Sequence, residues 1–447
     1  MDAGRLLLIN APSDKKVFFA AQAPVGILSI AACLQRAGFA AAVADLNVSG
    51  NWQADLRRLL NSYRPGVVGI SSVFSNRGDC LGIASITKSF NRDITVVAGG
   101  PHPTIAPEEY VCVDIDYVVP FESERIIPRF IASGGRCAVP GMIDCAKGEV
   151  AKQYAAIKRD PVNNLDELPF PDYRMVNLSR YQYSMNKRRP LVCAVTSRGC
   201  PAGCAFCSQG VFGRQWRGNS AEYVADLMEW IEKECGGGEI IFEDDNFTFD
   251  VERIFRLCRL IRSKKLKITW QASGVRVDRI SKELLRSMKE AGCWKIAFGP
   301  EVGDDESLRL IGKGLTLDDY RRAARWCRET GIIYFCYFVM GFSFQDEQKM
   351  RGVIDFAKEL DPLIMTLNKL MPFPGTEVYD KARVEAMHRR YLSFSYSGGD
   401  RTLEKMFKRA HLEFYLRPWK LARIAAVAGL RQFSRLAAYG FNLACSK

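Results

Sequence analysis

The chain of 447 residues alternates short apolar segments with amphipathic helical patterns, in two successive series. In the first series the candidate strands are 5–10, 41–46, 67–73, 95–100 and 117–119, with helical patterns such as 25–38 between them. Strands separated by helices pair in parallel, so this series predicts an α/β fold with a doubly wound sheet. Ligands of such sheets bind beyond the carboxyl ends of the strands, here at the loops 71–76 and 99–104.

The second series starts at residue 191 and contains six candidate strands. They are 191–197, 239–245, 267–273, 295–300, 334–341 and 363–371, with helical patterns such as 220–234 and 281–292 between them. Eight βα units close a barrel, so six predict a partial (β/α)6 barrel with an open side and an active site at the carboxyl ends of its strands. The irregular, proline-containing segment 133–187 is expected to be a linker. The expected domains are therefore 1–132 and 188–385, followed by a helical C-terminal region at 386–447.

The stretch 198-RGCPAGCAFCSQG-210 places Cys200, Cys204 and Cys207 at C-x3-C-x2-C spacing, directly after the first strand of the second series. The Gly and Pro residues among them indicate a loop, which argues against three buried structural thiols. Structural zinc prefers a second C-x2-C pair with a fourth Cys or His, and the sequence has no such pair. Three thiolates suit an iron–sulfur cluster with one iron open to a substrate. The other twelve cysteines stand singly, as in a protein of the reducing cytoplasm.

The segment CPAGCAFC resembles the cluster motif of the radical S-adenosylmethionine (SAM) enzymes, including the aromatic Phe206 before the third cysteine. The six βα units are similar to the partial barrel of that superfamily. The resemblance implies that the three cysteines bind a [4Fe-4S] cluster whose open iron chelates SAM. It also implies an external one-electron donor of the flavodoxin or ferredoxin type, and cleavage of SAM to a 5′-deoxyadenosyl radical.

Three further segments resemble the cobalamin-dependent branch of these enzymes. They are 242-FEDDNFTFD-250, 284-LLRSMKEAGCWKIAFGPEVG-303 and 337-YFVMGFSFQDE-347. The resemblance implies that Glu243 and Asp244 contact the methionine amino group, that Glu301 lies close to SAM, and that Gly341 lets the fifth strand approach the adenine. From the residues alone, the acidic run could be a solvated loop that caps the following helix, and Glu301 a surface glutamate.

The first series resembles the cobalamin-binding domain fused to these enzymes, through 24-PVGILSIAACLQRAGF-39 and 98-AGGPHPTIAPEE-109. The resemblance implies a Rossmann-like domain that binds cobalamin beside two loops. The residues expected there are Ser72, Asn76, Gly99, Gly100 and His102. A flavodoxin-like domain that has lost its ligand is the alternative. The chain reads 120-PFESE-124 where the family usually has GEGE, and no D-x-H-x-x-G motif offers cobalt an axial histidine.

The C-terminal region carries most of the net charge of +13, because residues 381–447 hold 14 Lys and Arg against 4 Asp and Glu. No nucleic-acid partner is expected, since such an enzyme would more often place its basic patch around the active site. After Pro418, a helix would set Lys420, Arg423, Arg431 and Arg435 opposite a broad apolar face. This predicts peripheral contact with an anionic membrane, or a helix packed on the barrel with its cations in water.

The N-terminus has no signal-peptide pattern, and no window approaches the length and apolar character of a transmembrane helix. We therefore expect a cytoplasmic protein, at the inner face of the membrane if the C-terminal helix binds lipid.

Together these features predict a cobalamin-dependent radical SAM enzyme. The leading hypothesis is C-methylation of an unactivated carbon in an apolar lipid or natural product, through methylcobalamin and a 5′-deoxyadenosyl radical. Non-methylating chemistry in the same branch is the first alternative, either oxidative ring closure or adenosyl transfer to a lipid. A non-catalytic iron–sulfur or zinc-binding interaction protein is the alternative from another class.

Overall fold

A computed structural model of the chain describes residues 5–13, 22–112, 114–181, 185–379 and 401–429. The chain divides into two compact units. The first comprises Met1–Tyr183 and Gln209–Asn219, and the second comprises Ser184–Ser208 and Ser220–Lys447. Among the described residues, no helix combines the length and the apolar character needed to cross a membrane.

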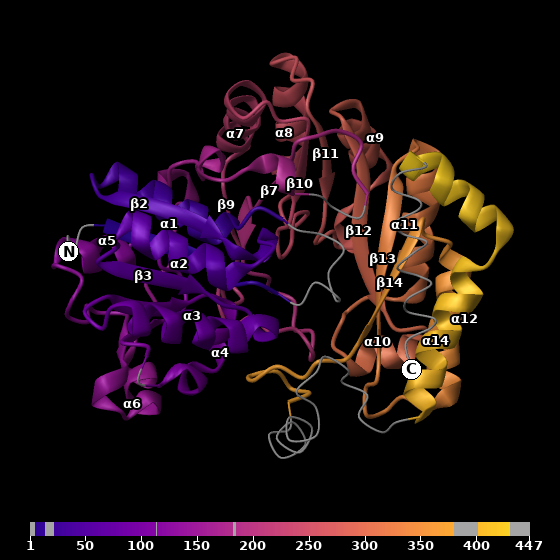
Figure 1. The fold of residues 1–447 in the computed structure, drawn as a ribbon. Coiled ribbons are helices and arrows are strands. Elements are labelled where there is room, and N and C mark those ends of the chain that lie inside the picture. The colour runs from indigo at the N-terminus through magenta and orange to yellow at the C-terminus, as the bar shows by residue number, and fades with distance from the viewer. Residues whose placement is uncertain (1–4, 14–21, 113, 182–184, 380–400, 430–447) are drawn as a thin grey trace. The chain divides into compact units, whose positions relative to one another are not determined.

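The first unit is built on a six-stranded sheet (Figure 1). In sheet order its strands are β2 (Ala40–Asp45), β1 (Arg5–Asn10), β3 (Val67–Ser71), β4 (Thr95–Gly99), β5 (Tyr117–Val119) and β6 (Ile143–Asp144). The first five strands are parallel, as predicted, and β6 adds an antiparallel edge. The edge strand β6 lies in the segment that was expected to be a linker, and two residues are too few to show a strand period.

Helices cover both faces of this sheet, which confirms the doubly wound fold. Leu6 and Leu8 of β1 pack in one core with α1 (Val25–Arg36) and α5 (Ile126–Ala132). Leu7 and Ile9 pack in a second core with α2 (Trp52–Tyr63) and α3 (Arg77–Phe90). The alternation follows from the two-residue period of a strand. The other α-helices and the other strand described in the unit are α4 (Pro101–Ile105), α6 (Val150–Ala156) and β9 (Arg217–Gly218).

The second unit contains the predicted partial barrel, a sheet of six parallel strands (Figure 1). In sheet order they are β14 (Ile364–Lys369), β13 (Ile333–Met340), β12 (Cys293–Glu301), β11 (Thr269–Ala272), β10 (Glu239–Phe242) and β7 (Leu191–Ala194). The helices are α7 (Ala221–Glu234), α8 (Val251–Ser263), α9 (Lys282–Glu290), α10 (Asp305–Leu310), α11 (Leu317–Thr330), α12 (Glu347–Leu360) and α14 (Arg401–Tyr415), and a short strand β8 (Ser197–Arg198) follows β7. We call the sheet face away from these helices the inner face.

A buried carboxylate closes the amino-terminal end of the inner face. Glu239, the first residue of β10, accepts hydrogen bonds from the backbone N–H groups of Lys187 at 2.6 Å and Arg188 at 2.9 Å. It also accepts from Gln271 Nε2 at 2.6 Å and Trp294 Nε1 at 3.0 Å. With the Thr269 hydroxyl at 3.4 Å, five donors from three parts of the chain offset the cost of burying this charge.

The C-terminal helical segment 418–429 packs on the same end of the barrel. Its Ile424 joins a core cluster with Phe335 and Ile364, which are register partners on the neighbouring strands β13 and β14. The expectation of a cationic face turned to water or membrane is wrong for Lys420, which is fully buried and paired with Asp361. Burial lowers the pKa of Lys420 to about 8.

Two more cations join the same carboxylate. Arg417 Nη2 lies 3.0 Å from Asp361 Oδ1, and Arg423 Nη1 lies 2.8 Å from Asp361 Oδ2. Arg423, another member of the predicted cationic face, is therefore also bound to the barrel, while Arg431 and Arg435 lie outside the described residues. Asp361 itself occupies a left-handed backbone position at φ 51.

We predict that Asp361→Asn destabilises the second unit by about 3 kcal/mol, because it leaves the buried Lys420 without its counter-charge. Asparagine tolerates the left-handed conformation, so the backbone should not add to this effect. Urea denaturation followed by far-UV circular dichroism measures the change. Asp318→Asn, at a side chain that is 80% exposed, is the control and should alter the free energy of unfolding by less than about 0.5 kcal/mol.

Candidate functional site

The three cysteines lie in one loop at the carboxyl end of β7, which we call the cluster loop (residues 199–208). Burial raises the pKa of the Cys204 and Cys207 thiols, and the charges of the three groups act on one another. Among the described residues, no three His, Cys, Asp or Glu side chains converge closely enough for a single metal ion. In a cluster each cysteine binds a different iron, so the sulfurs need not converge. The donor set of three thiols fits a cluster with one open iron.

The cluster loop is docked between two other segments of the second unit. Ala205 donates its N–H to the Ile311 carbonyl at 2.9 Å and accepts from the Glu377 N–H at 3.0 Å. A Cβ on Gly312 would stand 2.7 Å from the Gly203 carbonyl. Only glycine allows this approach, so the end of α10 and the loop fit together closely.

Two neighbouring carboxylates fix the start of the cluster loop. Asp244 is buried, and its carboxylate accepts from the Thr196 N–H at 2.7 Å, Thr196 Oγ1 at 2.8 Å and Ser197 Oγ at 2.7 Å. Asp245 accepts from the Gly199 N–H at 2.8 Å. Burial raises the pKa of Asp244 despite these donors. Asp244 thus directs its oxygens toward the chain, although the resemblance assigned it to the methionine amino group.

Glu301, at the end of β12, forms a largely buried ion pair. Lys313 Nζ lies 2.8 Å from Glu301 Oε1, and both side chains are largely buried. Burial alone would lower the pKa of Lys313, but the charges of Glu301, Tyr320 and Cys204 and the hydrogen bond to Glu301 together outweigh it and raise that pKa. Lys313 Nζ also lies 5.9 Å from the ring centroid of Phe206 in the cluster loop. Glu301 is therefore not a plain surface glutamate.

Glycine at position 299 makes room for the Glu301 carboxylate. A Cβ there would stand 1.9 Å from Glu301 Oε1, an impossible contact. Glu301 itself has φ 67, and the β12–β13 register shifts between Phe298 and Glu301. The end of β12 thus bends so that its carboxylate folds back over the strand.

The loop after β13 packs against the cluster loop through aromatic rings. The rings of Phe206 and Phe342 meet edge to face, with centroids 5.8 Å apart. Gly341, at φ 103, donates its N–H to Gln345 Oε1 at 2.8 Å, and Phe342 donates to the same oxygen at 3.2 Å. The structure therefore brings Phe206, Glu301 and Gly341 to one end of the sheet, as the pattern of strand ends predicted.

A buried cation lies deeper on the inner face. Lys295 of β12 is 1% exposed, and its Nζ lies 4.2 Å from the ring centroid of Phe335. Burial lowers the pKa of Lys295 to about 7, against the opposing charges of Glu243 and Glu239. Glu243 follows the end of β10 and is half-buried. The barrel thus holds a weakly basic lysine between a buried carboxylate at its floor and a more exposed one at its mouth.

In the first unit, the two predicted ligand loops are joined by buried hydrogen bonds. Ser72 Oγ lies 2.7 Å from Tyr110 Oη, and His102 Nδ1 lies 2.9 Å from the same hydroxyl. Ser72 Oγ also donates to Asn76 Oδ1 at 3.0 Å, and Asn76 Nδ2 donates to the Ala11 carbonyl at 3.0 Å. These side chains therefore hold the loops to each other, instead of extending from the edge of the sheet.

Glycines and one apolar residue form the outer part of this edge. A Cβ on Gly100, at φ 102, would stand 2.9 Å from the Ser72 carbonyl, and one on Gly99 would stand 3.4 Å from the Val119 carbonyl. Val73, at the tip of the β3 loop, is 37% exposed. The loop presents backbone and an apolar side chain, which fits a large ligand held without a ligating side chain from this loop.

Sequence reasoning missed four residues that organise these sites. They are Thr196, Lys295, Lys313 and Tyr110. Lys295 is the first residue of the predicted strand 295–300, and in the structure β12 begins two residues earlier and places this charge inside the strand. Thr196, Lys313 and Tyr110 act through partners distant in the sequence, and no local pattern marks them.

Two family models match the chain. Residues 19–131 match the B12 binding domain, and residues 194–357 match the Radical SAM superfamily. The first match covers most of the first sheet, and the second contains the cluster loop and the strands β10 to β13.

Curated relatives and a solved structure resemble the chain over most of its length. An uncharacterized methyltransferase of Pyrococcus horikoshii is 29% identical over 436 residues, covering 94% of this chain and 94% of that protein. The anaerobic magnesium-protoporphyrin IX monomethyl ester cyclase of Rubrivivax gelatinosus is 23% identical over 368 residues, 80% of this chain and 66% of that protein. The radical SAM methyltransferase TsrM from Kitasatospora setae, with cobalamin and a [4Fe-4S] cluster bound, shares the fold. Its TM-score is 0.68 at 20% identity, over 84% of this chain and 76% of that one.

We predict that Asp244→Asn lowers the iron bound after anaerobic reconstitution and destabilises the chain by about 2 kcal/mol. Asparagine removes the negative charge of Asp244. Its amide N–H group would face one of the N–H or O–H donors of Thr196 and Ser197, so at least one hydrogen bond is lost. Iron analysis and thermal unfolding of the same samples test this. Unchanged iron content with lowered stability would contradict a role of Asp244 in placing the cluster loop.

A second prediction concerns Lys295. Folding lowers its pKa from 10.5 to about 7, so the unfolded chain binds this proton more tightly throughout that window. Burying the charged Lys295 therefore lowers the free energy of unfolding by its full amount below pH 7. This loss is relieved as the pH rises toward 10.5, because Lys295 is then neutral in the native state. The free energy of unfolding of Lys295→Met minus that of wild type should therefore fall between pH 7 and 9.5, by about 1 kcal/mol per pH unit. The same difference for Lys152→Met, at a side chain that is 80% exposed, should stay flat.

Proposed function

Because the chain belongs to the cobalamin-dependent radical SAM enzymes, with a B12 binding domain ahead of a radical SAM domain, we propose that it methylates an unactivated carbon of a small-molecule or lipid substrate. When bound, the cluster and cobalamin would supply the reductive cleavage of SAM and a carrier for the methyl group. The residues of the chain hold, orient and shield these groups.

The placement of the cysteines carries this proposal. Cys200, Cys204 and Cys207 lie in one docked loop at the carboxyl edge, and Glu243 and Glu301 follow or end two other strands of the same sheet. In the proposal the three thiolates hold the cluster, whose open iron takes SAM. Glu243, half-buried at the carboxyl end of β10, is proposed to contact the methionine amino group, and Asp244 to hold the start of the cluster loop.

Other groups at this edge would orient the rest of SAM. Glu301 and Lys313 form a neutral pair whose oxygens and ammonium face the same region as Phe206. Gly341, half-buried at the end of β13 and at φ 103, has no Cβ, which here would stand 3.1 Å from the Leu403 side chain. We propose that the backbone of this turn lies beside the adenine. Such backbone suits the flat face of an adenine.

In the proposal, the carboxyl edge of the first unit holds cobalamin. Gly99 and Gly100 let the loop after β4 lie close to the Val119 and Ser72 carbonyls, and Ser72, Asn76 and His102 stiffen the loops from within. The buried His102 is bonded to Tyr110 and lies within the loop, so it is not placed as an axial ligand. Val73 at the loop tip has no atom that ligates cobalt.

Methylation is preferred because the relative that matches 94% of this chain is named a methyltransferase. Oxidative ring closure is the second candidate, because the cyclase of Rubrivivax gelatinosus also resembles the chain. Both reactions need the same cluster and SAM, so only the product separates them.

We predict that the anaerobically reconstituted wild-type chain contains about four irons and forms 5′-deoxyadenosine from SAM with dithionite. Cys204→Ala should lose most of the iron and all of the 5′-deoxyadenosine, since two cysteines cannot hold the cluster. Cys235→Ala, at a partly exposed cysteine outside the loop, is the matched control and should behave as wild type. A wild-type chain that forms no 5′-deoxyadenosine would refute the radical reaction.

The outcome of the reaction is tested with methyl-labelled SAM. The wild-type and Cys204→Ala chains, each with added cobalamin, are incubated with small molecules and lipids extracted from cells that lack the gene. Label that enters a compound only with the wild-type chain supports methylation. A product with two fewer hydrogens and no label would favour ring closure and overturn methylation.

A further inference from the structure

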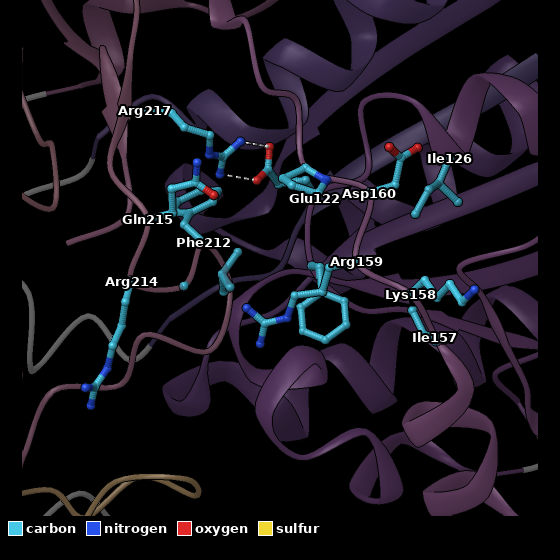
Figure 2. Close-up of a pocket in the computed structure, with 14 residues that line it drawn as sticks. Glu122, Ile126, Ile157, Lys158, Arg159, Asp160, Phe212, Arg214, Gln215 and Arg217 are labelled. Carbon is cyan, nitrogen blue, oxygen red and sulfur yellow. Dashed lines mark hydrogen bonds and ion pairs between the residues drawn. The ribbon is translucent and has the colours of Figure 1, made fainter. Parts of the chain in front are cut away.

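A cavity of about 190 Å³ lies within the first unit. It opens between the loop after β5, the segment 157–161 and the segment 211–217 (Figure 2). Gln209, which starts the stretch leading to the last of these segments, follows Cys207 by two residues in the chain. The proposed methylation assigns no role to this cavity.

The negative charges of the lining are already matched. Glu122 and Arg217 form an ion pair in which both side chains are only 5% exposed, and the two are joined by dashed lines in Figure 2. Glu122 Oε2 also accepts from the Val162 N–H at 3.3 Å, and Arg217 donates to the Val162 carbonyl at 2.6 Å. Asp160 is 3.5 Å from Arg125 and 3.4 Å from Arg129.

The remaining charges are positive. Lys158, Arg159 and Arg214 line the cavity, and within the described ranges none of them forms an ion pair. Figure 2 shows the Arg159 side chain near the centre of the hollow, whereas those of Lys158 and Arg214 point away from it on opposite sides. The cavity therefore has a positive field, and one guanidinium is aimed into it.

Arg159 is held in place by an aromatic ring. Its Cζ lies 4.3 Å from the ring centroid of Phe121, which in turn lies 5.5 Å from the ring of Tyr154. A Cβ on Gly213, at φ 76, would stand 3.1 Å from Arg159 Nη1, so the opposite wall passes close to the guanidinium. Stacking leaves the N–H groups free in the plane of the guanidinium, where they can bind two oxygens of one anion.

The Phe121 ring lies beneath Arg159 although the backbone of Phe121 is strained. Phe121 has φ 65, a left-handed conformation that costs a bulky residue about 1 to 2 kcal/mol. The Phe121 N–H donates to Thr104 Oγ1 at 2.9 Å, which fixes this conformation. Strain of this kind persists where the surroundings enforce it, and here it directs an aromatic ring under an arginine.

We propose that this cavity binds a carboxylate or phosphate group through the guanidinium of Arg159, stacked on Phe121. The neutralised Glu122–Arg217 pair forms one wall, and Lys158 and Arg214 add to the attraction. The anion would contact the stretch of chain that directly follows the cluster loop. Binding needs no turnover, so its test is independent of the proposed methylation.

The full-length chain with reconstituted cluster is titrated calorimetrically with inorganic phosphate and, separately, with succinate at constant ionic strength. Saturable binding of either anion is expected, and Arg159→Met should weaken it about tenfold or more, the loss expected for a charge-assisted bidentate contact. Arg57→Met, on the exposed side of α2, changes the net charge equally and should leave affinity within twofold. No saturable binding, or equal weakening in both variants, would overturn the proposal.

The Phe121→Gly variant tests whether the aromatic ring contributes to anion affinity beyond the positive charge of the cavity. Glycine accepts φ 65 without strain, so the midpoint of thermal unfolding should not fall by more than a few degrees. Phosphate or succinate affinity should still drop several-fold, since the guanidinium loses the ring that orients it. An unfolding midpoint and an affinity that both match wild type would refute the role of the ring.

Discussion

One buried carboxylate, that of Asp244, determines where the cluster loop begins. Three hydrogen bonds join it to Thr196 and Ser197 beyond the neighbouring strand, and Arg253 of α8 completes the network by donating to the Thr196 carbonyl at 3.0 Å and to Oγ1 at 2.8 Å. Without those donors the buried charge would bear its full desolvation cost. The start of the cluster loop therefore depends on hydrogen bonds that join the ends of β7 and β10 to α8.

In the first unit, buried side chains also fix loops through hydrogen bonds, but these side chains are uncharged. Tyr110 joins Ser72 to His102, so the two loops at the carboxyl edge are fixed by side chains that point into the protein. In both units, the polar residues near the expected ligands mostly serve the scaffold. Side chains whose hydrogen bonds are made within the chain keep a site in place before anything binds.

The sequence predicted most of the scaffold because its signals are local. The parallel strands follow from short apolar runs between amphipathic helices, and the cluster loop follows from three cysteines spaced by Gly and Pro. The edge strand β6 could not be predicted, since two residues show no period. The inward turn of Lys420 depends on Asp361, 59 positions earlier, and the pairing of Lys313 with Glu301 depends on the bend of β12. In each of these cases tertiary contacts override what the local pattern indicates.

The three cations around Asp361 also constrain the order in which the chain acquires its structure. Arg417, Lys420 and Arg423 come from the last part of the described chain, whereas Asp361 follows α12 and precedes the last strand of the barrel. On the ribosome, all six strands emerge before these partners do. Phe335 and Ile364 therefore lack their contact with Ile424 until helix 418–429 has been synthesised, and incompletely covered apolar surface of this kind favours association.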